Sequence, residues 1–137
     1  MEYTYEHKVQ YYETDQMGIV HHSNYIRWFE EARTEAMDNI GFGYAKMEEA
    51  GVMSPVLSVE CEYKTMTRFG ETAIINLEVK KYNGIRMEIE YTVRDRETND
   101  IRCIGKTSHC FLNKTGKIVS LKRDYPAMHD KVKIMVQ

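Results

Sequence analysis

The residues best suited to chemistry lie in one short segment, DQMGIVHH, at positions 15–22. It offers a carboxylate at Asp15, a glycine at Gly18 that permits positive φ or close backbone approach, and two imidazoles at the entrance of a predicted helix. A helix start presents unpaired N–H groups and the positive end of the helix dipole, so it can hold an oxyanion. A carboxylate beside it is the minimum equipment for attack on a carbonyl. The same acid could serve only as a cap or surface charge, and the segment alone leaves both interpretations open.

The elements that must position this segment follow from hydrophobic periodicity. Residues 3–11 alternate with a period of two, which predicts a strand. Residues 25–40 repeat apolar side chains every three or four positions, which predicts the main helix, about four turns long. Ser23 or Asn24 can cap its start and Gly41 can end it. A shorter helix is expected at residues 44–50, closed by Gly51.

The remainder of the chain has β periodicity. Strands are predicted at residues 57–63, 73–79, 85–93 and 101–113, with a short one at 118–121. Asn83-Gly84 predicts a tight hairpin with positive φ at both residues. Asp124, Tyr125 and Pro126 would open a last helix within residues 122–137, with Met128, Val132 and Met135 on one side.

This element order predicts an α+β fold with one antiparallel sheet of about five strands and one long helix packed on it. The 137 residues fit a single domain over 1–137. Such a sheet leaves an open edge, so pairing with a second subunit is expected.

Composition narrows the function classes. The net charge of −2 gives no global basis for binding nucleic acid. No apolar run is long enough to span a membrane, and the N-terminus has no signal-peptide core, so the expected location is cytoplasmic. The three cysteines have no C-x-x-C spacing, which predicts free thiols and no metal site: Cys61, Cys103 and Cys110. His7 and His109 are expected to be satisfied histidines on strand faces, and His21 to point outward or toward an interface.

Two consecutive motifs then connect this chain to a known family. The first is Asp15-x-x-Gly18-x-Val20-x-His22-x-x-Tyr25, and the second is the helical FEEARTE at residues 29–35. Together they resemble the signature of hotdog-fold acyl-CoA thioesterases, in particular the 4-hydroxybenzoyl-CoA thioesterase family and its branch of bacterial short-to-medium acyl-CoA thioesterases. The motif match covers residues 8–40, and the element order agrees to about residue 121.

The resemblance implies roles for the loop residues. Asp15 resembles the catalytic carboxylate, acting either as nucleophile on the thioester carbonyl or as base for a water. Aspartate is normally ionised at neutral pH, as both roles require. The backbone N–H of His22 would polarise the thioester oxygen, and its side chain would orient water or Asp15, or only cap and pack. Gly18 would let the loop pass close to the acyl group.

The resemblance also implies substrate contacts. Tyr25 and Glu30 align with pocket residues, Glu30 with an acid that contacts the acyl group in some members. Lys64 and Arg68, in the turn after the 57–63 strand, are the candidates for the CoA phosphates, although a solvated turn explains them equally well. Acyl pocket depth would depend on side chains that include Met17, Trp28, Phe29 and Met37.

The implied function is hydrolysis of acyl-CoA thioesters by a homodimer or homotetramer with active sites at the subunit interface. The implied cofactor set is empty: no metal and no organic group. Within the fold, a hydratase is disfavoured because no histidine precedes a Phe-Pro pair. An acyl carrier protein (ACP) thioesterase and a non-catalytic acyl-CoA or acyl-ACP binding protein stay open as alternatives.

Overall fold

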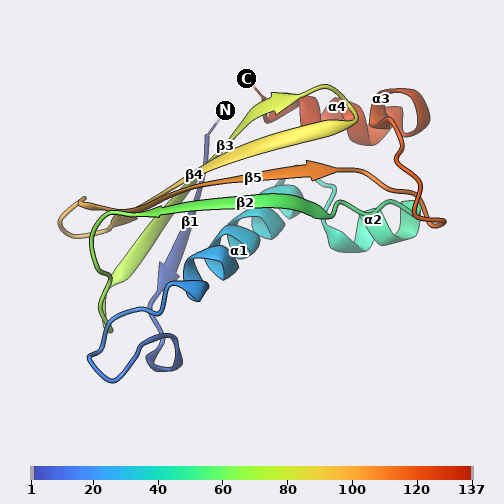
Figure 1. The fold of residues 1–137 in the computed structure, drawn as a ribbon. Helices are drawn as coiled ribbons and strands as arrows, with labels where there is room; N and C mark the ends of the chain where they lie inside the picture. Colours follow the sequence, from blue (N-terminus) through green and yellow to red (C-terminus); the bar gives the residue numbers. More distant parts are fainter. Residues whose placement is uncertain (1, 137) are drawn as a thin grey trace.

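The fold is built around one antiparallel sheet that wraps along a long helix (Figure 1). The computed structural model describes residues 2–136; positions 1 and 137, the ends of the predicted domain, lie outside the described residues. The strands run in the order β1-β3-β4-β5-β2, so β1 and β2 are the sheet edges. The elements are β1 Glu2–Lys8, α1 Ser23–Asn39, α2 Tyr44–Ala50, β2 Val56–Tyr63, β3 Thr72–Tyr82, β4 Arg86–Asp95, β5 Ile101–Cys110, α3 Leu121–Asp124 and α4 Pro126–Ile134. The predicted α+β architecture with five strands is confirmed.

The core lies between α1 and the inner face of the sheet. Alternate residues of β4 are buried there, as the period of two predicts: Met87, Ile89, Tyr91 and Val93. The Phe29 ring of α1 stacks on the Tyr91 ring with centroids 4.3 Å apart. A Cβ at Gly105 would lie 2.4 Å from two ring atoms of Phe29, so a glycine is required at this close approach of helix and sheet.

Several boundaries differ from the predictions. The first strand ends at Lys8, because the chain turns into a short 3-10 helix, Tyr11–Glu13. The 83–84 hairpin forms, but only Gly84 of the two has positive φ. The Asn83 side chain instead accepts hydrogen bonds from the N–H groups of Ile85 and Arg86. Residues 118–121 do not form a strand, since Leu121 begins α3. The structure confirms the predicted helix ends at Gly41 and Gly51 and the predicted helix start at Pro126. The predicted apolar side of the last helix is buried: Met128, Val132 and Met135.

The predicted helix cap is wrong. The N-cap position of α1 is His22, so Ser23 and Asn24 lie inside the first turn. Asn24 instead donates its side-chain amide to the carbonyl oxygens of Glu13 and His21, at 2.9 and 3.3 Å. Asn24 thus ties the helix start to the preceding chain. No helix within residues 2–136 is long and apolar enough to cross a membrane.

The two strand histidines differ. His7 is satisfied, with its ring nitrogens 2.8 Å from Glu13 Oε1 and 3.3 Å from Glu31 Oε2. His109 is fully buried, and its Nε2 pairs with Thr107 Oγ1 at 2.8 Å, whereas its Nδ1 has no hydrogen-bond partner among the described residues. The prediction of a fully satisfied His109 is therefore wrong.

Burial, and then the positive charge of Arg33, lower the pKa of His109 from 6.5 to about 4. Between these values an unfolded chain binds a proton here that the folded protein does not. The free energy of unfolding should therefore fall as pH drops through this window, by up to about 3 kcal/mol. Urea denaturation from about pH 7 to about pH 5 measures this fall, and His109→Gln should flatten it. Equal slopes for the two proteins would contradict the prediction.

Candidate active site

The loop between β1 and α1 is folded around the Asp15 carboxylate. Oδ1 of Asp15 accepts hydrogen bonds from the N–H groups of Met17 and Ile19, at 2.8 and 3.2 Å. The backbone closes the same turn, because Gly18 N–H donates to the Asp15 carbonyl at 3.0 Å. Within residues 2–136, Asp15 Oδ2 takes part in no hydrogen bond or ion pair. One carboxylate oxygen therefore holds the loop, while the other is available for chemistry.

Gly18 shapes this turn through its backbone conformation. Its φ is +74°, in the left-handed region, and open space surrounds the position where a Cβ would be. A side chain would therefore be disfavoured by conformation and not by a clash. Gly18 does not line the cavity at Asp15, so its expected approach to an acyl group has no support within one protomer.

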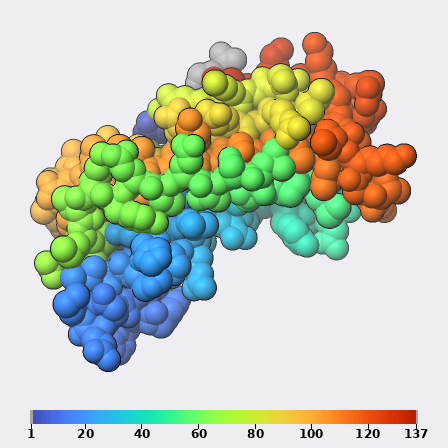
Figure 2. Space-filling view, viewed as in Figure 1, coloured from blue at the N-terminus to red at the C-terminus, as the bar shows by residue number. Residues whose placement is uncertain are grey.

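The loop is docked onto the connection between β2 and β3. Val20 N–H donates to the Thr67 carbonyl at 2.9 Å, and Phe69 N–H donates to the Gly18 carbonyl at 3.0 Å. On the other side, His21 N–H donates to the Glu13 carbonyl at 2.9 Å. Figure 2 shows this loop projecting from the body of the protein beside that connection. Asp15 is thus exposed, but hydrogen bonds to neighbouring segments hold the backbone of its loop in place.

The start of α1 supplies one unpaired donor beside the loop. The N–H groups of Ser23 and Asn24 are satisfied by the side chain and the carbonyl of His21. The His22 N–H makes no hydrogen bond within the described part of the chain. Because α1 is 17 residues long, its N-terminal end carries the full positive end of the helix dipole. The His22 N–H is therefore a suitable donor to a developing oxyanion.

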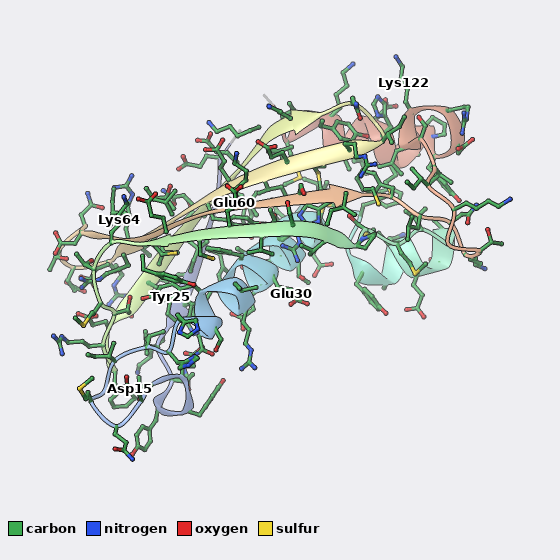
Figure 3. The ribbon with its side chains drawn as sticks, viewed as in Figure 1. Asp15, Tyr25, Glu30, Glu60, Lys64 and Lys122 are labelled. Atoms are coloured by element: carbon green, nitrogen blue, oxygen red, sulfur yellow. The ribbon has the colours of Figure 1, made fainter. Side chains whose placement is uncertain are left out.

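A cavity of about 680 Å³ joins the two groups. Its walls come from the loop, the start of α1, the end of β2 and the following turn, and β5. The lining residues are Asp15, Val20, His21, His22, Tyr25, Tyr63, Lys64, Thr65, Met66, Arg68 and Arg102. Five of the seven predicted site residues thus line one cavity: Asp15, His22, Tyr25, Lys64 and Arg68. Figure 3 shows Asp15 on the loop, Tyr25 near the start of α1 and Lys64 near the end of β2. His21 lines the cavity as well, beside the His22 ring at 4.2 Å between centroids.

Glu30 does not lie in this cavity. It is exposed on α1, away from Asp15 (Figure 3), and lines a separate cavity of about 470 Å³ between α1 and α2. Four methionines line that second cavity: Met37, Met47, Met53 and Met87. Trp28 and Phe29, expected near the acyl group, are fully buried core residues and line neither cavity. Within one protomer, the polar Asp15 site and this methionine-rich cavity are therefore separate.

Tyr25 forms the inner wall of the Asp15 cavity. Its hydroxyl pairs with Thr67 Oγ1 at 2.8 Å, and its ring lies between Trp28 and Tyr63 with centroids 4.9 and 5.5 Å away. Burial raises the pKa of Tyr25 above its ordinary value. Tyr25 is therefore a neutral aromatic surface at physiological pH and a weaker acid than an ordinary tyrosine.

The basic residues at the cavity differ in availability. Lys64 Nζ lies 2.6 Å from Glu62 Oε1, in an exposed pair that solvent screens. Arg68 makes no ion pair among the described residues. Arg102, which sequence reasoning missed, pairs with Glu71 at 3.2 Å. A register shift between β4 and β5 at Val93/Arg94 lies beside Arg102 and breaks the alternation that strand patterns assume.

Glu13 is the second residue that sequence reasoning missed. The strand pattern of residues 3–11 gave no role to Glu13, but the 3-10 helix turns it inward, where only 4% of it is exposed. Its signal was the capping-box spacing with Gln10, whose N–H donates to Glu13 Oε1 at 2.8 Å.

Comparison with known proteins identifies the family of this chain. Residues 9–133 match the thioesterase-like superfamily. The chain is 35% identical over 125 residues to YneP of Bacillus subtilis, covering 90% of both chains. It is 27% identical over 84 residues to the acyl-CoA thioesterase YbgC of Haemophilus influenzae, covering 61% of this chain and 62% of that one. The DHNA-CoA thioesterase of Staphylococcus aureus has 31% sequence identity and a TM-score of 0.90, over 97% of this chain and 89% of that one. The chain therefore has the hotdog fold and belongs to the thioesterase-like superfamily, as its two motifs indicated.

Proposed function

We propose that this protein hydrolyses acyl-CoA thioesters, with Asp15 and the His22 N–H as its reacting and polarising groups. The observation that carries the proposal is the pairing of a free carboxylate oxygen with an unpaired helix-start N–H on one open cavity. The names of YbgC and of the staphylococcal thioesterase give independent support for thioester hydrolysis.

The reaction needs little further machinery. As nucleophile, Asp15 Oδ2 would attack the carbonyl carbon, the C–S bond would break, and water would hydrolyse the resulting anhydride. As base, Asp15 would take a proton from a water that attacks the same carbon. In both routes the His22 N–H would stabilise the negative charge on the carbonyl oxygen, and the His22 side chain could orient water or Asp15. Thiolate is a good leaving group, so no strong acid is required.

The cavity mouth suits the CoA handle. Arg68 has no carboxylate partner within residues 2–136, and Lys64 is exposed beside it on the same cavity. Both can approach phosphate groups, for which guanidinium and ammonium groups are suitable partners. A cytoplasmic location is part of this proposal.

We assign the open edge of β2 to a second copy of this chain. Val56, Leu57, Val59 and Tyr63 are exposed apolar residues on this edge strand, which faces the viewer in Figure 1. Exposed edges of this kind favour pairing with another strand. Antiparallel pairing of two β2 strands about their centres would place Tyr63 beside Val56 of the partner subunit. The partner's methionine-rich cavity and its Glu30 would then approach Asp15 and could receive the acyl group.

Val59→Asp tests this interface. In the pairing that places Tyr63 beside Val56 of the partner subunit, an aspartate at position 59 would lie beside Glu60 of the partner subunit, and like charges facing each other across strands are destabilising. We expect wild type to have twice the 16.2 kDa chain mass, or a multiple of it, by light scattering. The variant should be monomeric and lose hydrolysis at least about tenfold, because the site is completed by the partner. Ile134→Asp, at an exposed position of α4, is the matched control and should retain both properties. A fully active wild-type monomer would refute the assignment.

Turnover separates the enzyme from its alternatives. Thiol release from aliphatic and aromatic acyl-CoAs should exceed one equivalent per chain if the protein is a CoA thioesterase. Release from acyl carrier protein esters alone would instead support a carrier-protein thioesterase. Tight binding of acyl-CoA without release would support a non-catalytic binding protein.

A further inference from the structure

Glu13 is a buried carboxylate that the proposed reaction does not use directly. It ends the 3-10 helix and precedes Asp15 by two positions. A carboxylate with 4% exposure requires compensating hydrogen bonds, because burial of an unpaired charge is costly. Its partners therefore indicate what it holds in place.

The Glu13 carboxylate joins three segments of the chain. Oε1 accepts hydrogen bonds from His7 Nε2 of β1 and from the Gln10 N–H, each at 2.8 Å. Oε2 accepts from Trp28 Nε1 of α1 at 2.7 Å. Burial alone would raise the pKa of Glu13, but these hydrogen bonds outweigh it and hold the pKa below the ordinary value. Glu13 is therefore ionised, and both of its carboxylate oxygens accept hydrogen bonds.

The Glu13 backbone makes a second connection, at the helix start. Its carbonyl oxygen accepts from the His21 N–H and from Asn24 Nδ2, both at 2.9 Å. These two residues flank the His22 N–H, while Asp15 follows Glu13 by two positions on the other side. Glu13 thus holds in place both the loop that carries Asp15 and the helix start that presents the His22 N–H.

We propose that Glu13 is a positioning residue that fixes the Asp15 carboxylate relative to the His22 N–H. The proposal rests on the proposed function. Displacing a reacting group by about 1 Å can lower a rate about 100-fold. A residue that fixes the Asp15 carboxylate relative to the His22 N–H therefore affects turnover more than substrate binding.

Glu13→Gln tests this positioning role with almost no change of volume. A glutamine has one acceptor oxygen and one NH2 group, whereas the Gln10 N–H and Trp28 Nε1 are donors that reach different oxygens of Glu13. Whichever way the amide turns, its NH2 group meets one of these two donors. A change of His7 tautomer cannot relieve this conflict. Trp28→Phe removes one donor and would let the amide oxygen face Gln10.

The expected results separate positioning from stability alone. In Glu13→Gln, kcat should fall about 10- to 100-fold while KM changes by less than about threefold. The double variant with Trp28→Phe should recover at least about threefold in kcat, so the two losses are not multiplicative. Rates are compared at a temperature at which near-UV circular dichroism shows each protein folded. Loss of folded protein alone would leave kcat per folded molecule unchanged.

Two further variants complete the test. Glu31→Gln is the matched control, because Glu31 also faces His7 but is exposed, and its kcat should stay within about twofold of wild type. If Glu13→Gln does not fold, Asn24→Ala removes the donor to the Glu13 carbonyl, and kcat should fall at least about fivefold with KM unchanged. The proposal would be overturned by a kcat of Glu13→Gln within about threefold of wild type, or by multiplicative losses in the double variant. If Glu13→Gln does not fold, an unchanged kcat in Asn24→Ala would overturn it. An inactive wild type would instead contradict the proposed function.

Discussion

Asp15→Asn should lower kcat/KM for acyl-CoA hydrolysis by about 100-fold or more, a loss of at least about 2.7 kcal/mol of transition-state stabilisation. The amide is neutral, so it can neither attack the carbonyl carbon nor take a proton from water. Its oxygen can still accept the Met17 and Ile19 N–H groups that Asp15 Oδ1 now accepts. The loop should therefore keep its fold, and the loss should fall on the chemical step.

The measurement is thiol release across a substrate range, combined with calorimetric binding of the same acyl-CoA to the variant. Binding should stay within about threefold of wild type, because a loop that keeps its fold preserves the cavity. Asp100→Asn makes the same chemical change at an exposed turn residue outside the cavity and should be fully active. Undiminished hydrolysis by Asp15→Asn would remove Asp15 from the mechanism.

Phe29→Ala should lower the free energy of unfolding by about 3–5 kcal/mol, the largest stability effect we expect. The ring is fully buried, stacks on Tyr91 at 4.3 Å, and fills the space left open at Gly105. Its removal leaves a cavity between α1 and the sheet. For a chain of this size the melting temperature should fall by roughly 10 to 20 °C.

Denaturant unfolding at one fixed protein concentration measures this loss, since subunit association can also shift apparent stability. Phe69→Ala makes the same chemical change at a ring that is 57% exposed, and it should cost less than about 1 kcal/mol. Equal losses of unfolding free energy in the two variants would mean that the contact between α1 and the sheet is not a major source of stability.

Periodicity predicted the fold well where one face of an element is buried. Residues of β4 and α1 meet across the core, so their apolar side chains recur with periods that the sequence displays. Periodicity failed where local hydrogen bonding decides. The Asn24 side chain donates a hydrogen bond to the Glu13 carbonyl oxygen, so it does not act as the predicted cap of α1. Glu13 is turned inward by a 3-10 helix that no repeat pattern displays.

The candidate site was only partly predictable for a related reason. Asp15, His22 and Tyr25 lie within one short stretch, and their spacing carries the family motif. Arg102 comes from a distant strand, next to a register shift that sequence alternation does not reveal. Glu30 was expected in the pocket, but within one protomer it lies outside the Asp15 cavity and lines the second cavity between α1 and α2. In the proposed dimer, its distance from an acyl group would depend on how the two copies pair.

The most direct test mixes each protein in equimolar amounts with an acyl-CoA that both bind and follows the bound ester by mass spectrometry. The account predicts that wild type converts the ester to free acid and CoA, and that Asp15→Asn holds it intact over the same interval. Conversion at equal rates by both proteins would show that another group performs the chemistry. An ester that stays intact on wild type would show that the protein binds acyl-CoA without hydrolysing it.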